Sequence, residues 1–398
     1  MDWQSTSSER YWDAEPPAGR RKVWVRHVGH SEAVSAPHRV PRSALRKGPG
    51  VSSRLVTLDG SHGEGGGQIL RTALSLSLLT GKPFRITRIR ANREKPGLRP
   101  QHLTAVQAAA ALGRAEVRGA AVGARELTFH PASYEPRDLT IDIGTAGSTS
   151  LVLQTLHLPL AIRATDPVRV MLTGGTFNPK APAFPFLETT WRAHLAAMGF
   201  PIALTMPEAG FHPRGGGRLD AWIEPGKPRA LHRATRGPLR RIHGVAGVAN
   251  LRPDIAERMR ARAIARLAEH GLTAEITLAD WRSPGQGAAI ALCVEHEGIA
   301  PATFVGLGER GKPSEVVADE AVMELLAFES VDQGAVDPHS ADQIVLPLAL
   351  APGQSNYTVT EITDHLRTNV ATIQAFLDRE ITIEEPTEGR PGWVAIGE

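Results

Sequence analysis

Apolar and polar positions alternate regularly from Arg54 onward, and the pattern predicts short strands separated by helices. The segments "RLVTLDG", "FRITRIRA", "ELTFHP" and "LTIDIGTAG" have the alternation expected of half-buried strands. Between them, "GQILRTALSLSLLTG" and "PQHLTAVQAAAALG" carry apolar residues at helical spacing. These two helices are expected to end at Gly81 and Gly113, since glycine commonly follows the last helical residue.

Three segments share the succession of a strand, a turn and an apolar helix. They are "RLVTLDG" with the helix after it, "LTIDIGTAG" with "STSLVLQTLHLPLAI", and "SNYTVTEI" with "TDHLRTNVATIQAFL". Their intervals are irregular, which favours an α/β domain built from repeated βα modules over a solenoid of fixed period. Residues 236–335 differ in style and include a long basic helix. We therefore expect a large domain over 54–235 and 336–398, with 236–335 forming a smaller inserted α/β domain.

Residues 1–53 show little periodicity and contain several prolines and basic groups, so a flexible N-terminal arm is expected. The arm lacks the apolar core of a secretory signal, and its acidic residues argue against a transit peptide. A weak electrostatic contact with RNA and a dispensable start are both compatible with this composition.

Composition restricts the class of protein more than it defines the activity. The chain has 398 residues, of which 41% are hydrophobic and 22% charged, and it contains no apolar run long enough to cross a bilayer. Cys293 is the only cysteine, so no internal disulfide can form and a reducing, cytoplasmic location is expected. Cys293 sits among apolar residues in "AIALCVEH", which favours core packing over a nucleophile.

The glycine-rich stretch "SHGEGGGQILR" lies between a predicted strand and a predicted helix. It lacks the Walker spacing, and Gln68 occupies the position where G-x-G-x-x-G requires a third glycine. Successive glycines still allow backbone N–H groups to approach an anion at a helix start. Glu64 would repel a phosphate there unless a divalent cation lay between them. A phosphate site and a plain turn with a solvated glutamate both remain open.

Basic side chains are dense in the next loop, "RIRANREKPGLRPQH". The planar guanidinium of arginine binds two phosphate oxygens at once, so this loop is a candidate anion site. A solvated charged surface is the alternative. Aromatic residues are not interleaved with the basic ones, which argues against base stacking of the single-strand-binding type.

The predicted helix in "TDHLRTNVATIQAFL" places a histidine close to its start. Four apolar residues, spaced four, three and four apart, form a buried stripe: Leu366, Val370, Ile373 and Leu377. His365 lies about 100° around the helix from Leu366 and therefore off this stripe. Thr363 could cap the helix, and the helix dipole would then favour a neutral, nucleophilic imidazole. A surface histidine on an amphipathic helix is the alternative.

Taken in order, these motifs closely resemble the RNA 3′-terminal phosphate cyclases. The resemblance begins in "LDGSHGEGGGQILRTALSLSLLTGKPFRITRIRANREKPGLRPQHLTAV" and continues in "GTAGSTSLVLQTL", "GGTFNPKAP", "GFHPRGGG", "ADQIVLPLALA" and "HLRTN". It extends from about Arg54 to the C-terminus. It implies an α/β (α+β) fold with a large domain of three βαβαββ-like repeats and a smaller inserted α/β domain.

The resemblance also implies a reaction and its reactants. Members of this family use ATP and a divalent cation, Mg²⁺ or Mn²⁺, to convert the 3′-phosphate of an RNA into a 2′,3′-cyclic phosphate. The reaction passes through a covalent histidine–AMP and an RNA–adenylate. The expected partner is therefore RNA with a 3′-phosphate end, and no membrane association is expected.

Site residues follow from the resemblance position by position. His365 matches the nucleophile and Glu64 the metal ligand. The positions implied to hold phosphates of ATP or of the RNA end are Arg71, Arg90, Arg93 and Gln101. The positions implied to form the adenosine pocket are Gln154, Pro182, His339, Ser340, Ala341, Asp342 and Gln343. His339 stands where the family often has an adenine-stacking tyrosine, and Phe177 replaces a residue that is usually polar.

Two other classes of protein share features of this architecture. A ribosome-assembly protein with the cyclase fold would lack the catalytic histidine, so His365 disfavours that role. An enolpyruvyl transferase would have related repeats but needs no nucleotidylated histidine, and the ordered motifs point away from it.

Overall fold

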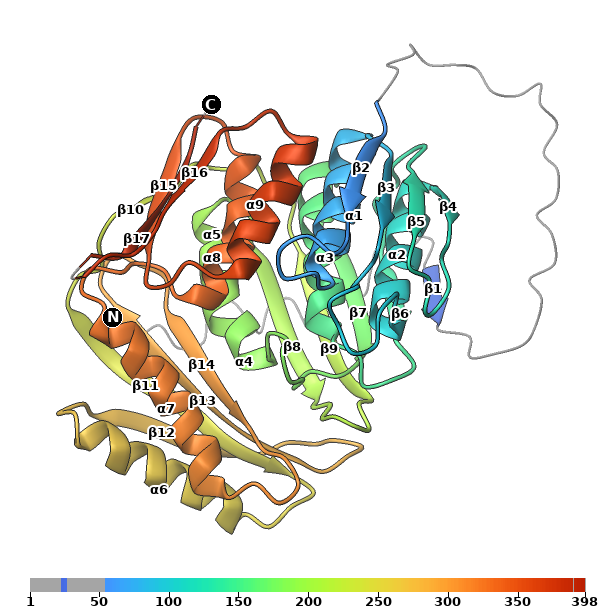
Figure 1. The fold of residues 1–398 in the computed structure, drawn as a ribbon. Coiled ribbons are helices and arrows are strands. Elements are labelled where there is room, and N and C mark those ends of the chain that lie inside the picture. The colour runs from blue at the N-terminus through green and yellow to red at the C-terminus, as the bar shows by residue number, and fades with distance from the viewer. Residues whose placement is uncertain (1–22, 27–53, 389, 398) are drawn as a thin grey trace, which may run out of the picture.

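A computed structural model describes residues 23–26, 54–388 and 390–397, and these form a mixed α/β protein, as predicted (Figure 1). Within these residues, no helix is both long and apolar enough to cross a membrane. Most of segment 1–53, the expected arm, lies outside the described residues. Its described part, Val23–Arg26, forms strand β1. The alternation in "VWVR" suits a strand, and Val25 is buried.

The first structural unit follows the predicted succession closely. Its elements are β2 (Val56–Asp59), α1 (Gln68–Thr80), β3 (Phe84–Thr87), α2 (Pro100–Gly113), β4 (Glu116–Arg118) and β5 (Leu127–His130). The sheet order is β2-β3-β5-β4, in which β2 and β3 are parallel and the other neighbours are antiparallel. Helix α1 ends at Gly81, whose φ of 73° suits the left-handed conformation that glycine adopts freely.

The second unit repeats this topology. Its elements are β6 (Leu139–Asp142), α3 (Thr149–Arg163), β7 (Val168–Gly174), a helical segment, β8 (Ile202–Glu208) and β9 (Gly217–Ile223). The helical segment consists of three consecutive elements: α4 (Phe184–Phe186), the π-helix η2 (Leu187–Trp191) and α5 (Arg192–Ala197). The order β1-β6-β7-β9-β8 places β1 at the edge, parallel to β6. Apart from β1, the pairing pattern matches that of the first unit.

The third unit has the same strand order but is interrupted. Its elements are β10 (His232–Arg233), α8 (Pro338–Ala349), β15 (Ser355–Val359), α9 (Asp364–Phe376), β16 (Ile381–Glu384) and β17 (Gly392–Ile396). The sheet order is β10-β15-β17-β16, with β10 parallel to β15. The β15–α9 module is thus the second strand–helix pair of its unit, whereas β2–α1 and β6–α3 are first pairs. The inserted residues separate β10 from α8, which is why the first pair was not visible in the sequence.

The elements between β10 and α8 build a separate sheet with its own core. They are β11 (Leu239–Ala249), α6 (Asp254–Ala268), β12 (Ala274–Asp280), β13 (Gly287–His296), β14 (Ala302–Leu307) and α7 (Ser314–Ser330). The sheet order is β12-β11-β13-β14, and helices α6 and α7 pack against each other on one of its faces. Ile290, Leu292, Phe304 and Val322 belong to a hydrophobic cluster distinct from that of the three-unit domain.

Helices from all three units meet at the centre of the large domain, with the sheets outside them (Figure 1). Helix α1 packs against α2, α3 and α9, and α8 packs against α9. The predicted stripe on α9 is confirmed for three of its four residues: Leu366 and Ile373 are fully buried and Val370 is nearly so. Leu377 follows the last helical residue, Phe376, and is only partly buried. This packing fixes the position of the first turn of α9 relative to α1.

Two residues singled out in the sequence lie near the junction of the large and inserted domains. Cys293 is buried in β13, as predicted, and burial raises the pKa of its thiol to about 11. Phe177 is buried and stacks on Phe211 at 4.7 Å between ring centroids, with Trp281 at 4.9 Å. The apolar residue at position 177 is therefore explained by packing against aromatic neighbours from both domains.

Candidate active site

A cleft of about 1160 Å³ lies where the helices of the three units meet the inserted domain. It is lined by almost all of the predicted site residues: Glu64, Arg71, Arg90, Arg93, Gln101, Gln154, Pro182, His339, Asp342, Gln343 and His365. Strand β14 and helix α7 of the inserted domain contribute Thr303, Val305, Leu307 and Glu324 to the lining. The cleft therefore brings together segments that lie as far apart in the sequence as Glu64 and Asn369.

Helix α9 delivers His365 to this cleft in the way the sequence predicts. The Thr363 side chain accepts a hydrogen bond of 3.2 Å from the backbone N–H of Leu366 and so caps the helix. His365 occupies the first turn, off the buried stripe, and 51% of its side chain is exposed. The imidazole is thus held by a buried helix but remains accessible from the cleft.

Two polar residues orient the imidazole of His365. Its Nδ1 lies 2.8 Å from Gln68 Oε1, and Gln68 Nε2 donates to Asp342 Oδ2 at 2.6 Å. Since the amide nitrogen of Gln68 is engaged by Asp342, its oxygen faces the ring and accepts from Nδ1–H. This hydrogen bond selects the tautomer in which Nε2 is unprotonated. No described residue donates a hydrogen bond to Nε2, which leaves its lone pair available.

The electrostatics of the site favour the neutral imidazole. Burial lowers the pKa of His365; Asp342 opposes this, while Arg71 and Arg93 add to it. Burial also raises the pKa of Asp342, against the influence of His365 and the hydrogen bond from Gln68. The result is a neutral imidazole in a cleft that is otherwise rich in positive charge.

Glu64 lies beside the histidine and has an incompletely satisfied carboxylate. Its Oε1 forms an ion pair with Arg93, and its backbone N–H donates to Thr368 Oγ1 at 3.2 Å. Its Oε2 is 3.1 Å from His365 Nδ1 but is buried and receives no well-aligned hydrogen bond from the described residues. A buried carboxylate oxygen of this kind is suited to a cation.

The glycines before α1 allow other side chains to come close to the backbone. At Gly67, a Cβ would lie 2.3 Å from His102 Nε2 and 2.8 Å from Arg71 Nη1. At Gly63, with φ of 55°, it would lie 2.2 Å from Thr368 Oγ1. Close packing by His102, Arg71 and Thr368 thus accounts for glycine at both positions.

Arginine side chains form the positive wall of the cleft. Burial lowers the pKa of Arg71 to about 10, and nearby Asp342 opposes this, so Arg71 remains charged at neutral pH. Arg90 Nη1 donates to the carbonyls of Lys95 and Gly97 at 2.8 and 3.0 Å, which fixes its guanidinium at the cleft. Burial, followed by the charges of Arg71 and Arg90, holds the pKa of His102 well below its usual range. His102 therefore adds no further positive charge.

The predicted adenosine residues form a hydrogen-bonded chain along one side of the cleft. Gln154 Nε2 donates to Gln343 Oε1 at 2.5 Å, and Gln343 Nε2 donates to the His339 carbonyl at 2.7 Å. His339 Nε2 lies 3.3 Å from Glu324 Oε2 of the inserted domain, and this interaction raises the pKa of His339. The inserted domain thus contacts this part of the site directly.

Ser340 and Ala341, which were predicted with the adenosine pocket, do not line the cleft. Both are buried on the opposite side of α8, where the Ala341 carbonyl accepts a hydrogen bond from the Tyr357 hydroxyl. The reason is helical geometry: His339, Asp342 and Gln343, at relative positions 0, 3 and 4, share one face, and positions 1 and 2 do not.

Several cleft residues were missed by sequence reasoning. The clearest are Gln68, noted only for breaking a glycine motif, and Asn369, which accepts a hydrogen bond from Thr72 at 2.7 Å. Asn369 lies four residues after His365, so helical spacing could have identified it. Asn178 and Lys180, in the segment "GGTFNPKAP", also line the cleft. No local signal marks Gln68, because its partners lie 274 and 297 residues away.

The arrangement is an arginine-lined cleft that contains a neutral histidine, and comparisons with known proteins identify its family. A family model described as RNA 3′-terminal phosphate cyclase matches residues 62–383. A curated protein of that name from Ralstonia nicotianae is 46% identical over 332 residues, covering 83% of this chain and 93% of the relative. Another, from Pyrobaculum neutrophilum, is 43% identical over 334 residues, covering 83% and 95%. A third, from Koribacter versatilis, is 44% identical over 344 residues, covering 86% and 95%.

The chain belongs to the RNA 3′-terminal phosphate cyclase family. This membership confirms the family and the class of enzyme that the ordered sequence motifs predicted.

Proposed function

We propose that this protein uses ATP to convert an RNA 3′-terminal phosphate into a 2′,3′-cyclic phosphate, with His365 as the nucleophile. The observation that carries the proposal is the contact between His365 and Gln68. It keeps the proton on Nδ1 and leaves Nε2 free to react. The relatives named RNA 3′-terminal phosphate cyclase support the overall reaction.

The first step is nucleotidyl transfer to the protein. Nε2 of His365 attacks the α-phosphorus of ATP, a P–N bond forms, the bond to the β-phosphate oxygen breaks, and diphosphate leaves. The lowered pKa of His365 supplies the unprotonated nitrogen at neutral pH. Arg71 and Arg90, both at the cleft, would stabilise charge on the phosphate oxygens.

The remaining steps pass AMP to the RNA and then release it. An oxygen of the RNA 3′-phosphate attacks the phosphorus of His365–AMP, and the P–N bond breaks. The neighbouring 2′-hydroxyl then attacks the activated 3′-phosphorus, loses its proton, and AMP departs. A terminal phosphate lacks a good leaving group until AMP is attached to it, which explains why the reaction consumes ATP.

The residues also fit a divalent cation, Mg²⁺ or Mn²⁺. Glu64 would hold it, since Oε2 is buried without a well-aligned hydrogen bond among the described residues and lies in the same cleft as the arginines. Such an ion offsets the repulsion between this carboxylate and the phosphates of ATP. The adenosine is expected along the side formed by Gln154, Pro182 and Gln343. A cytoplasmic location stays a prediction from the single, buried cysteine.

The test is formation of a protein–AMP adduct. The wild-type protein, incubated with ATP labelled at the α-phosphate and with Mg²⁺ or Mn²⁺, is expected to yield an acid-labile labelled adduct. His365→Asn should reduce the labelling on the order of 10⁴-fold or more, as expected for loss of a nucleophile. His62→Asn is the matched control, because His62 is exposed on the glycine-rich turn and does not line the cleft.

An adduct that persists in the His365→Asn protein would contradict the nucleophile assignment. End-group analysis of a 3′-phosphorylated oligonucleotide then tests the overall reaction. If the adduct forms but no cyclic end appears, the protein is a nucleotidyl acceptor with another substrate. If neither forms, the non-catalytic role known for cyclase-like ribosome-assembly proteins is favoured.

A further inference from the structure

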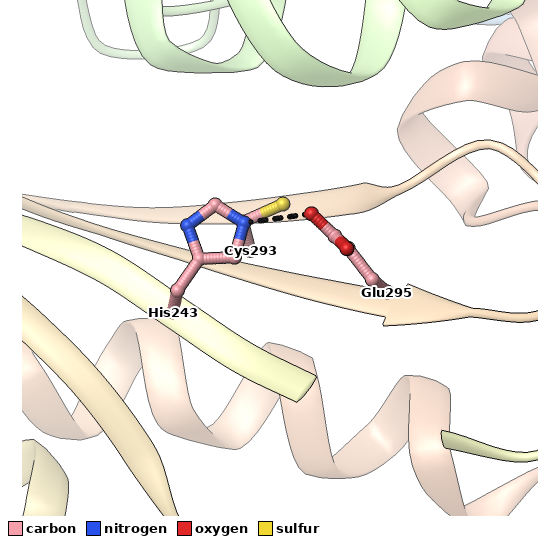
Figure 2. Close-up of side chains that lie close together, drawn as sticks. All are labelled: His243, Cys293 and Glu295. Carbon is pink, nitrogen blue, oxygen red and sulfur yellow. Dashed lines mark hydrogen bonds and ion pairs between the residues drawn. The ribbon is translucent and has the colours of Figure 1, made fainter. Parts of the chain in front are cut away.

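A second cluster of potential metal ligands lies in the inserted domain, on strands β11 and β13, next to the cleft-lining strand β14. His243 on β11 is the direct cross-strand partner of Cys293 on β13, and Glu295 follows two residues later on the same face (Figure 2). One ligand atom from each of these side chains lies within 4.8 Å of the others. Figure 2 shows the imidazole, the thiol and the carboxylate converging.

We propose that His243, Cys293 and Glu295 bind a zinc ion that joins strands β11 and β13. A tetrahedral site has Zn–N and Zn–O distances of about 2.0–2.2 Å and a Zn–S distance of about 2.3 Å. Donor atoms in such a site are therefore roughly 3–4 Å apart. His243 Nε2 and Glu295 Oε1 are already 3.1 Å apart, so the remaining adjustment is a small movement of side chains.

The three donors favour zinc over the hard cations that phosphate chemistry uses. Thiolate and imidazole are ligands for Zn²⁺, whereas Mg²⁺ prefers oxygen ligands. On binding, the Cys293 thiol loses its proton to solvent as the Zn–S bond forms, and His243 binds through unprotonated Nε2. Three protein ligands leave a fourth position for water. No electron transfer is involved.

Arg241 is the main competitor for Glu295, and its position is compatible with metal binding. Its Nε and Nη2 lie 2.9 and 2.7 Å from the two Glu295 oxygens. The side chain of Arg241 is 61% exposed, so it can release Oε1 to the ion and keep its contact with Oε2. A carboxylate ligand held by an outer hydrogen bond is common at metal sites.

The surroundings provide both access and support. The side chains of His243 and Glu295 are 30% and 24% exposed, which gives the ion a route from solvent. Cys293 is buried next to Thr303, its cross-strand partner on β14, and Thr303 bonds to Thr190 of η2 at 2.8 Å. The proposed ion would therefore lie close to the contact between the inserted and large domains.

Cobalt(II) binding to the full chain, dialysed against chelator and then assayed in excess Mg²⁺, tests the proposal. Because Cys293 is the only cysteine, a thiolate-to-cobalt band in the near ultraviolet can arise only there. The expected result is a band that saturates at one ion per chain, is abolished by Zn²⁺, and is absent from Cys293→Ser. His243→Ala and Glu295→Gln should each weaken binding at least tenfold, about the effect of disturbing a metal site.

His270→Ala is the matched control, because this histidine of the inserted domain is exposed and outside the cluster. It should bind cobalt as the wild type does. Absence of the band from the wild type would overturn the proposal, as would unchanged affinity in both His243→Ala and Glu295→Gln. These two variants alter partly exposed side chains, so the test does not depend on Cys293→Ser folding. A stoichiometry of one ion per two chains would show a site between molecules and would also overturn it.

Discussion

The turn from β2 to α1 and the turn from β15 to α9 both deliver side chains to the cleft, but they are built differently. The first is rich in glycine, has positive φ at Gly63 and Gly65, and leads into a helix with no side-chain cap. The second contains no glycine and ends in Thr363, which caps α9. The glycine-rich turn admits side chains from other elements, whereas the capped turn fixes the start of one helix. Together they place Glu64 and His365 in the same cleft.

Of the changes in and around these two turns, replacing Gln68, the first residue of α1, should reduce the rate of adenylylation most. Gln68→Met removes the acceptor of His365 Nδ1–H, and we expect adenylylation to slow roughly 10- to 100-fold, as for loss of an orienting partner. Gln374→Met on the exposed face of α9 is the control. Single-turnover labelling with ATP measures the rates.

The pH profile of the same variant separates orientation from simple loss of packing. In the wild type, burial lowers the pKa of His365, so the acid limb of adenylylation should lie below pH 6.5. Without Gln68, the protonated ring loses an acceptor of Nδ1–H, which disfavours the charged imidazole and moves this limb to lower pH. An unchanged rate with an unchanged limb would contradict the orienting role of Gln68.

A methyl group in the glycine-rich turn tests whether close approach matters there. Gly63→Ala places Cβ against Thr368 Oγ1 and imposes a left-handed backbone on alanine, which costs roughly 1–2 kcal/mol. Gly81→Ala has the same strain, with φ of 73°, but no atom within 4 Å of the new Cβ. Denaturant unfolding should show a lower free energy of unfolding for both variants. Slower adenylylation is expected only for Gly63→Ala, because Thr368 accepts a hydrogen bond from the Glu64 N–H. Equal effects of the two variants on adenylylation would show that the Thr368 contact is irrelevant to the site.

Removing the Thr363 cap from the turn between β15 and α9 should have the smallest effect on adenylylation. Thr363→Ala loses the bond to the Leu366 N–H and is expected to lower the free energy of unfolding by about 1 kcal/mol. Thr363→Ser keeps the acceptor and should restore most of that loss. Since the stripe of α9 stays buried, His365 should still be adenylylated in both proteins. Loss of the adduct in Thr363→Ala alone would mean that the cap, and not the stripe, positions the histidine.

Patterns within a short stretch of sequence predicted those features of α9 that depend on neighbouring residues. The spacing from Leu366 to Ile373 and the cap at Thr363 gave the start and orientation of α9, and hence the accessibility of His365. The resemblance to the family then gave a set of site residues, nearly all of which line the cleft. It extended the adenosine pocket to Ser340 and Ala341, which the 3.6-residue period of α8 turns away from the cleft.

Contacts between distant segments account for what the sequence did not predict. The position of Gln68 between His365 and Asp342 exists only because α1, α8 and α9 pack together. Strand β1 falls in a segment with little periodicity, and its pairing with β6 depends on an edge built more than 100 residues later. The Glu324 contact with His339 likewise requires the inserted domain to be in place. No pattern within one element carries that information.

The division of the site among the three units has a consequence for the newly made chain. A ribosome releases a protein from its amino end, so the segment with Glu64, Gln68 and Arg71 emerges long before α9. Until α9 docks, Gln68 has no imidazole to orient, and the arginine-lined surface can meet nucleotides without reacting with them. Under the proposed mechanism, capacity for self-adenylylation would arise only when the third unit closes, so labelling by ATP would report the completion of folding.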